Sequence, residues 1–294
     1  MYKKPMRMKS VHNLGRIGYP IVSISTEDRE TILENSLLDK TIQATLVTPY
    51  ILGEKPISLM IVAKPESGKT SAMKRYSSNK GIIYLTDATA YGIQRDILPK
   101  LTSGEIRTIM IADLITPLSK STKTRQAFVA FCNNMIEEGV AKITTYAMTW
   151  DKEVKGNIVT AVTDQALDDG RHEWAKIGFL SRFIMFSYSY DLSTVHAILQ
   201  SYSRGGLINR SKTMEFPKEN VDVTLDPQIA DKLDPLAVRI GDDFGIYGIR
   251  AKINLRSLLK ALAYLNGRVA VQMADFDELL RLVDYMNFKY NPLR

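Results

Sequence analysis

Short apolar runs alternate with segments of helical periodicity over the first two thirds of the chain. Each run is bounded by polar or turn-forming residues, as expected for strands of a parallel sheet that is buried on both faces. The predicted strands are 57–62, 82–85, 108–112, 157–162 and 183–186. A predicted helix at 28–47 precedes the first strand. The predicted helices between strands are 69–78, 90–100 and 123–138, the last ending at Gly139. Strands that alternate with helices predict an α/β fold, a parallel-sheet sandwich.

The pattern changes in the last third of the chain. Residues 206–225 are polar and irregular, and two amphipathic helical stripes follow on either side of Gly267. The stripes are Leu255, Leu258, Leu259, Leu262 and Leu265, then Phe276, Leu279, Leu280 and Val283. We therefore divide the chain into a basic N-terminal segment (1–30), an α/β core (31–205) and a small C-terminal helical domain (206–294).

Composition excludes few classes of protein. The 294 residues are 45% hydrophobic, and no apolar run reaches the roughly 20 residues that a membrane span needs. The single cysteine, Cys132, cannot form an internal disulfide, which favours a cytoplasmic location, and a zinc site is improbable with three histidines. The net charge of +7 favours an anionic partner, but compositional scatter explains it equally well until the charges are located.

Residues 63–70 carry the strongest functional pattern. They match the phosphate-binding loop G-x-x-x-x-G-K-[ST], with alanine in place of the first glycine. In such a loop, backbone N–H groups at a helix N-terminus face the phosphates of ATP, Lys69 reaches the β- and γ-phosphates, and the Thr70 hydroxyl holds Mg²⁺. A positive φ at Ala63 would be strained. The predicted ATP-binding residues are Ala63, Lys64, Pro65, Glu66, Ser67, Gly68, Lys69 and Thr70.

Acidic residues follow two of the predicted strands. Asp113 ends the third strand, where a second Mg²⁺ ligand is expected beside Thr70. Many ATPases of this kind place a glutamate directly after that aspartate to polarise the attacking water, but here the next residue is Leu114. Asp87, after the second strand, is a candidate to polarise water instead, or a loop aspartate without a catalytic role. The sequence therefore predicts binding of ATP more firmly than its hydrolysis.

Three later segments, together with the loop, resemble the AAA+ superfamily, in the branch of minichromosome-maintenance helicases and MoxR-like ATPases. They are GNIVTAVTD (156–164), GFLSRF (178–183) and NLRSLL (254–259), the last leading to AYLNGRV (263–269). The resemblance covers about residues 35–290. It implies a P-loop NTPase core, a C-terminal helical lid, ATP hydrolysis and a ring of identical subunits, with a hexamer as one option.

The resemblance also implies roles for single residues. Thr163 matches the polar sensor-1 position, with Thr160 as the alternative. Arg182 matches the arginine finger that reaches the γ-phosphate held by a neighbouring subunit; a local salt bridge is the other interpretation. Arg256 matches the sensor-2 arginine of the lid, with Arg250 as the alternative.

A segment before the 157–162 strand gives the only located hint of a substrate. Residues 143–148 have β-branched and aromatic content that favours a hairpin within 140–155, where helicase-like relatives of the resemblance carry a pore hairpin. Lys152 and Lys155 would contact phosphates of DNA there, and Trp150 would stack on a base. A hairpin that supports the subunit interface fits equally well. Three functions stay open: a motor or loader on DNA, a MoxR-like remodeller of proteins, and a nucleotide-gated assembly protein with weak hydrolysis.

Overall fold

The computed structural model describes residues 21–22, 36–137, 142–145, 148–151, 154–203, 211–244 and 247–286. Its centre is a sheet of five strands, all parallel, in the order β3-β4-β7-β2-β8. The strands are β2 (Ser58–Ala63), β3 (Gly81–Leu85), β4 (Ile106–Ile111), β7 (Asn157–Thr163) and β8 (Phe183–Ser187). The α/β fold and all five predicted strands are confirmed, to within two residues at each end.

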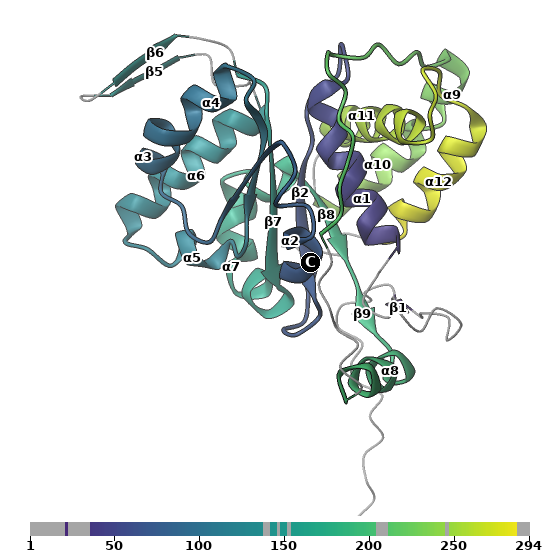
Figure 1. Ribbon diagram of the computed structural model, residues 1–294, viewed down its shortest axis with the longest axis horizontal. Coiled ribbons are helices and arrows are strands. Elements are labelled where there is room, and N and C mark those ends of the chain that lie inside the picture. Colours follow the sequence, from purple (N-terminus) through teal and green to yellow (C-terminus); the bar gives the residue numbers. More distant parts are fainter. Residues whose placement is uncertain are drawn as a thin grey trace, which may run out of the picture.

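Helices lie on both sides of this sheet (Figure 1). To the left of β7 in Figure 1 are α3 (Ala90–Gly92), α4 (Leu98–Thr102), α5 (Ile115–Leu118), α6 (Thr122–Glu137) and α7 (Asp164–Lys176). A π-helical turn (Ile93–Ile97) joins α3 to α4. Near β2 are α1 (Ser36–Val47) and the short α2 (Lys69–Lys74). The described part of α1 begins at residue 36, and the predicted helical residues 28–35 and the expected cap Gly139 lie outside the described residues.

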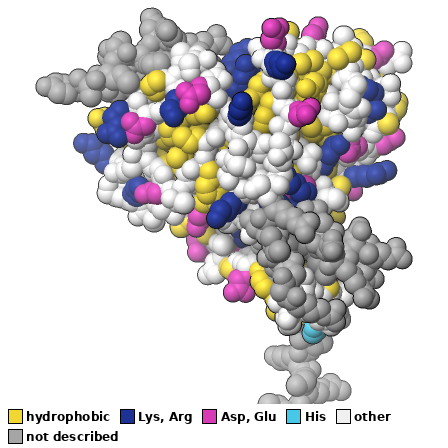
Figure 2. Space-filling view, viewed as in Figure 1, with side chains coloured by type: hydrophobic (Ala, Val, Ile, Leu, Met, Phe, Trp, Pro, Cys, Tyr) yellow, Lys and Arg dark blue, Asp and Glu magenta, His cyan; other side chains and the backbone are white. Residues whose placement is uncertain are grey.

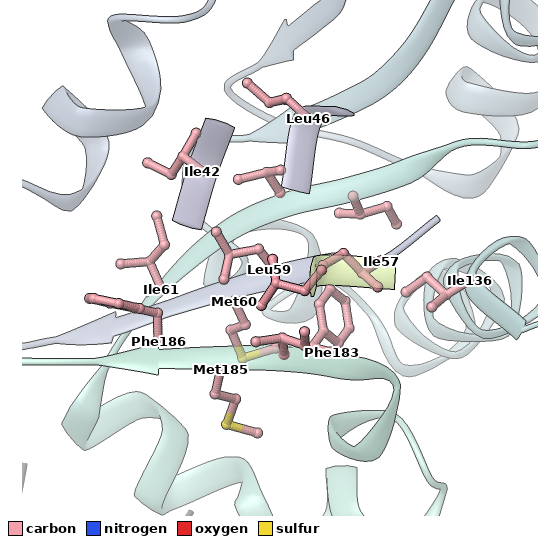
Figure 3. Close-up of a cluster of buried hydrophobic side chains, with 14 of the residues drawn as sticks. Ile42, Leu46, Ile57, Leu59, Met60, Ile61, Ile136, Phe183, Met185 and Phe186 are labelled. Carbon is pink, nitrogen blue, oxygen red and sulfur yellow. The ribbon is translucent and has the colours of Figure 1, made fainter. Parts of the chain in front are cut away.

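Side chains of β2 form the centre of the hydrophobic core (Figure 3). All six of its residues are buried, and the strand is flanked by β7 and β8. Ile42 and Leu46 of α1 cover it from one side, in contact with the same cluster as Phe186 of β8. A strand buried on both faces explains why this segment is an unbroken apolar run rather than an alternating one.

The C-terminal helices share this core through α1. They are α9 (Pro227–Asp231), α10 (Asp234–Phe244), α11 (Ile249–Leu265) and α12 (Met273–Val283). Both α11 and α12 contact α1. Most of the two predicted apolar stripes is buried, with Leu258, Leu262 and Leu279 fully so, but Leu280 is exposed. The segment 211–226 has neither helix nor strand, apart from isolated bridges, as its polar composition predicts.

Apart from the short α5, two of the described helices before residue 206 were not foreseen in the sequence. In α7, only Leu167 and Trp174 are buried, so too few apolar positions exist to form a recognisable stripe. Helix α8 (Leu192–Ser203) projects from the body beyond β9 (Ser189–Tyr190), which pairs with β1 (Ile21–Val22), and its apolar residues Leu192, Leu199 and Tyr202 are exposed. Periodicity identifies a helix only where one face is buried and the other is polar.

Within the described residues, no helix has the length and apolar character that crossing a bilayer requires. Charged side chains of both signs are spread over the face drawn in Figure 2. The positive net charge is therefore not concentrated in one region of that face.

Candidate functional site

The loop between β2 and α2 has the backbone of a phosphate-binding turn. Positive φ angles occur at Glu66 (62°) and Gly68 (82°), and Gly68 directly precedes the first helical residue, Lys69. Ala63 does not need a positive φ, because it ends β2 in register with Thr163 of β7. The strain expected at the alanine is therefore absent, and the glycine that the pattern usually places there is not required for the backbone of this loop.

The Lys69 side chain turns back into the loop. Its Nζ donates to the carbonyl oxygens of Ala63 (2.7 Å) and Lys64 (2.6 Å) and to Ser67 Oγ (3.2 Å). Burial lowers the pKa of the Lys69 ammonium to about 8, against the opposing effect of the nearby Asp164 and Asp113 carboxylates. The ammonium is thus desolvated and held by neutral oxygens, which anionic oxygens of a ligand can replace.

Two tyrosines hold the loop from the other side. The hydroxyls of Tyr188 and Tyr190 both donate to the Ser67 carbonyl, at 2.8 and 2.9 Å. Both follow the carboxyl end of β8, beside β2. No sequence pattern indicates this support, because aromatic residues after a strand have many other uses. Lys64, Pro65 and Glu66 remain exposed, as does Thr70 in the first turn of α2.

Two carboxylates lie at the same edge of the sheet as the loop. Asp113 follows β4, is exposed, and accepts a hydrogen bond from the Ile115 N–H (3.0 Å). Asp164 begins α7 directly after β7, and it has the stronger effect of the two on Lys69. We did not select Asp164 from the sequence. Its position after a strand was a usable signal, since the carboxyl ends of parallel strands meet at one edge.

The oxygens at this edge suit a magnesium ion with phosphate ligands. The Thr70 hydroxyl and the Asp113 carboxylate are hard oxygen donors, and Mg²⁺ is usually held by one or two carboxylates together with substrate phosphates. Leu114, in contrast, is 1% exposed and belongs to the core. The position where a glutamate was expected thus serves packing and has no group that could act on water.

The other candidate residues near this edge have local partners. Thr163 caps α7, where its hydroxyl accepts from the Ala166 N–H at 3.2 Å, whereas Thr160 is fully buried and donates to the Ile111 carbonyl. Thr163 is therefore the threonine that borders the loop. Asp87 forms an ion pair with Lys120 at 2.6 Å, which lowers the pKa of its carboxyl group.

The arginines lie at the opposite edge of the sheet. Arg182 directly precedes β8, whose first residue, Phe183, is in register with Ser58 at the start of β2. The loop follows the other end of β2, about 16 Å away at roughly 3.3 Å per residue. Arg182 cannot reach the loop of its own chain.

Glu137 at the end of α6 binds two of these arginines. Its carboxylate lies 3.0 Å from Arg182 Nε and 2.9 Å from Arg250 Nη2, and Arg250 also donates to Ser181 Oγ (2.8 Å). The local salt bridge considered for Arg182 is therefore present. Arg256 pairs at the same edge with the buried Glu54 (2.8 Å).

The predicted hairpin is confirmed in its described part. β5 (Lys142–Thr145) and β6 (Met148–Asp151) pair antiparallel, with Trp150 opposite Ile143, and the hairpin extends away from the body in Figure 1. Lys155 follows it and is exposed, whereas Lys152 lies outside the described residues.

Comparisons with known proteins add no relative. No protein-family model matches the chain, and a search of curated proteins finds no significant match. The function must therefore be argued from the geometry.

Proposed function

We propose that the chain binds Mg²⁺-ATP in the loop 63–70 and hydrolyses it as an AAA+-type ATPase. One observation carries the proposal: a left-handed Gly68 presents the buried ammonium of Lys69 at a helix N-terminus, at the carboxyl end of the inner strand β2. Helix N-termini favour anions, and phosphates bind most readily where backbone N–H groups and a cation converge.

Four residues around the loop have separate roles in this proposal. The Lys69 ammonium exchanges its loop carbonyls for β- and γ-phosphate oxygens, and the Thr70 hydroxyl and Asp113 hold the metal. The bound metal ion neutralises charge on the phosphates. Asp164 supplies the carboxylate that the Asp113-Leu114 pair lacks, and it orients the attacking water. The separation of β4 from β2 by β7 supports this arrangement, because it places Thr163 and Asp164 between the loop and Asp113.

Asp164→Asn should lower ATP turnover by about 10²-fold or more, the usual contribution of a positioned base. Affinity for ATP should change little, because the amide keeps the size of the side chain and Lys69 remains. Single-turnover hydrolysis and a fluorescent-ATP titration measure the two quantities. The matched change Asp168→Asn, one helical turn later on α7, should leave both near wild type. Equal turnover for the two variants would remove Asp164 from the mechanism.

The affinity for ATP should also fall at alkaline pH. The ordinary lysine pKa is about 10.5, but that of Lys69 is lowered to about 8, so the free site loses its proton as pH rises above 8. Only the ammonium form attracts phosphate, so the affinity for ATP should drop by up to about tenfold per pH unit above pH 8. Below pH 8, titration of Lys69 should leave the affinity unchanged. Titrations from pH 6.5 to 9.5 test this. A flat profile across that range would contradict the role given to Lys69.

The further assembly is proposed from the resemblance and the positions of the arginines. The helices α9 to α12 form the lid, and identical subunits form a ring in which Arg182 serves the loop of the next copy. Arg256 or Arg250 acts as the sensor-2 arginine and also serves the loop of a neighbouring subunit, since both lie at the edge of the sheet away from their own loop. Nucleic acid is the proposed substrate, supported by the extended β5–β6 hairpin and the exposed Lys155.

The substrate class is tested by ATPase rates measured alone, with single-stranded DNA and with duplex DNA. Stimulation by DNA supports the motor. A rate that no DNA changes favours the MoxR-like remodelling of proteins, and turnover near background despite tight ATP binding favours a nucleotide-gated assembly protein.

A further inference from the structure

A pocket of about 470 Å³ opens at the amino ends of β3 and β4. Its walls come from Tyr50, from the turns that precede β3 and β4, and from residues 213, 214 and 216–218. Because the loop 63–70 follows the carboxyl end of β2 in the same parallel sheet, this pocket is at the other edge and is a separate site. Its volume is within the range of small-ligand pockets, roughly 300–1,000 Å³.

Two anchors fix the outer wall of the pocket. The Lys212 ammonium lies 2.9 Å from the buried carboxylate of Asp39 in α1, and the side chain of Asn79 bonds the backbone of both Lys212 and Met214. The chain beyond them is tied to the sheet by Arg107, whose Nη1 donates to Asn220 Oδ1 at 2.7 Å. The irregular segment is thus held in place, and the pocket is preformed.

Flat groups line the interior. The Arg107 guanidinium lies 4.3 Å from the centre of the Tyr50 ring, and Phe216 stacks on the same ring at 5.4 Å with an angle of 16° between the planes. Phe216 is only half-buried. Guanidinium and aromatic planes of this kind are the surfaces on which unpaired bases stack.

The charged groups at the pocket are predominantly cationic. Lys80 and Lys218 line it and are exposed, and Arg107 adds a third positive charge. Of the described residues that line the pocket, Glu105 is the only acid, and its carboxylate pairs with Lys100 outside at 3.5 Å. Among the described residues, the acceptors of Arg107 are the Pro49 carbonyl and Asn220 Oδ1, and both accept from Nη1. The pocket therefore offers N–H donors and positive charge to an anion.

The cations continue past the pocket along the edge of the sheet. Lys80 precedes β3, Arg107 is in β4, and Lys155 precedes β7, and these three strands are neighbours. Gly156 packs so closely on β4 that an added Cβ would lie 3.0 Å from the Arg107 carbonyl oxygen. Adjacent strands are about 4.8 Å apart, so the three residues form a row along this edge of the sheet. A row suits an extended polyanion better than a single phosphate.

We propose that this pocket and Lys155 bind single-stranded nucleic acid, with phosphates on Lys80, Arg107 and Lys218 and a base against the Arg107 and Phe216 planes. The inference rests on the proposed action on nucleic acid but not on ATP binding. A duplex does not fit, because its bases are already paired and stacked and cannot enter a pocket of this size. Lys155 continues the row from the pocket toward the β5–β6 hairpin, so the pocket and the hairpin would contact the same nucleic-acid strand.

The test is fluorescence anisotropy of a labelled 20-nucleotide oligo-dT with the full chain, without nucleotide, over 50–300 mM salt. The double variant Lys80→Gln/Lys218→Gln removes two phosphate contacts. At roughly 0.7 counterions per contact for single strands, the salt slope should fall by about 1.4 and the affinity at 0.1 M salt by about 25-fold. The matched control Lys123→Gln/Lys232→Gln makes the same change in net charge at two exposed lysines that do not line the pocket and should lose less than about threefold.

Equal losses in the two double variants would show a non-specific charge effect and overturn the inference, as would displacement of oligo-dT by inorganic phosphate at the same phosphate concentration. Absence of any oligo-dT binding at 50 mM salt would overturn it too. Lys69→Ala should keep wild-type affinity for oligo-dT, and ATP binding by the pocket variant should be unchanged, so failure here is distinguishable from failure of the ATP site.

Discussion

Lys69→Ala should reduce ATP affinity by at least about 30-fold, because it removes the buried ammonium that lies in the loop. Its ammonium donates to three neutral oxygens, which phosphate oxygens can replace. Truncating one partner of a desolvated charge pair costs about 2–5 kcal/mol of binding free energy, which corresponds to this change or a larger one. A fluorescent-ATP titration measures it.

The matched control for this change is Lys74→Ala, an exposed lysine at the end of the same helix. It should bind ATP like the wild type. The lowered pKa of Lys69 reflects the free-energy cost of burying its charge, so replacing it should not destabilise the fold. Far-UV circular dichroism should therefore show the same helix content for both variants. Unchanged ATP affinity in folded Lys69→Ala would refute the nucleotide site.

Arg182→Ala should leave ATP affinity nearly intact and lower turnover in the assembled protein by about 10³-fold or more, as for an arginine that acts on a neighbour's phosphate. The two effects separate because Arg182 lies at the opposite end of β2 and β8 from its own loop. Steady-state ATPase rates at protein concentrations above the assembly threshold give the measurement.

Glu137→Gln distinguishes this role from a structural one. It removes the carboxylate that holds Arg182 and Arg250 but leaves both arginines, and turnover should stay near wild type. If Glu137→Gln and Arg182→Ala lose turnover equally, Arg182 acts through its salt bridge alone.

Mixing gives a further test of action between subunits. Lys69→Ala and Arg182→Ala chains are each inactive, but a mixed ring contains interfaces that combine an intact loop with an intact arginine. With random mixing, roughly a quarter of the head-to-tail interfaces would be complete, and turnover should recover toward that fraction. No recovery in assembled mixtures would argue against a shared site.

Much of the site was predictable from the sequence, because its parts are local. The residues from Ala63 to Thr70 contain both the chemical groups and the turn that presents them, and the apolar run before them could only be a buried strand. Asp113 was found because it ends another such strand. The prediction missed Asp164, since the helix that it begins is too polar to be recognised and a strand-ending threonine drew attention instead.

The sequence by itself determined which segments become strands, which lysine faces a helix N-terminus, and that the last third of the chain is helical. These properties depend on spacing within a dozen residues. Only the tertiary structure decided that Asp164 lies close enough to Lys69 to affect its pKa. The same holds for Arg182, which lies beside Glu137 at the far edge of the sheet, and for Lys80, Arg107 and Lys218, which line one pocket. Strand order and the path of an irregular segment set those distances, and both result from packing between residues far apart in the sequence, which no local pattern encodes.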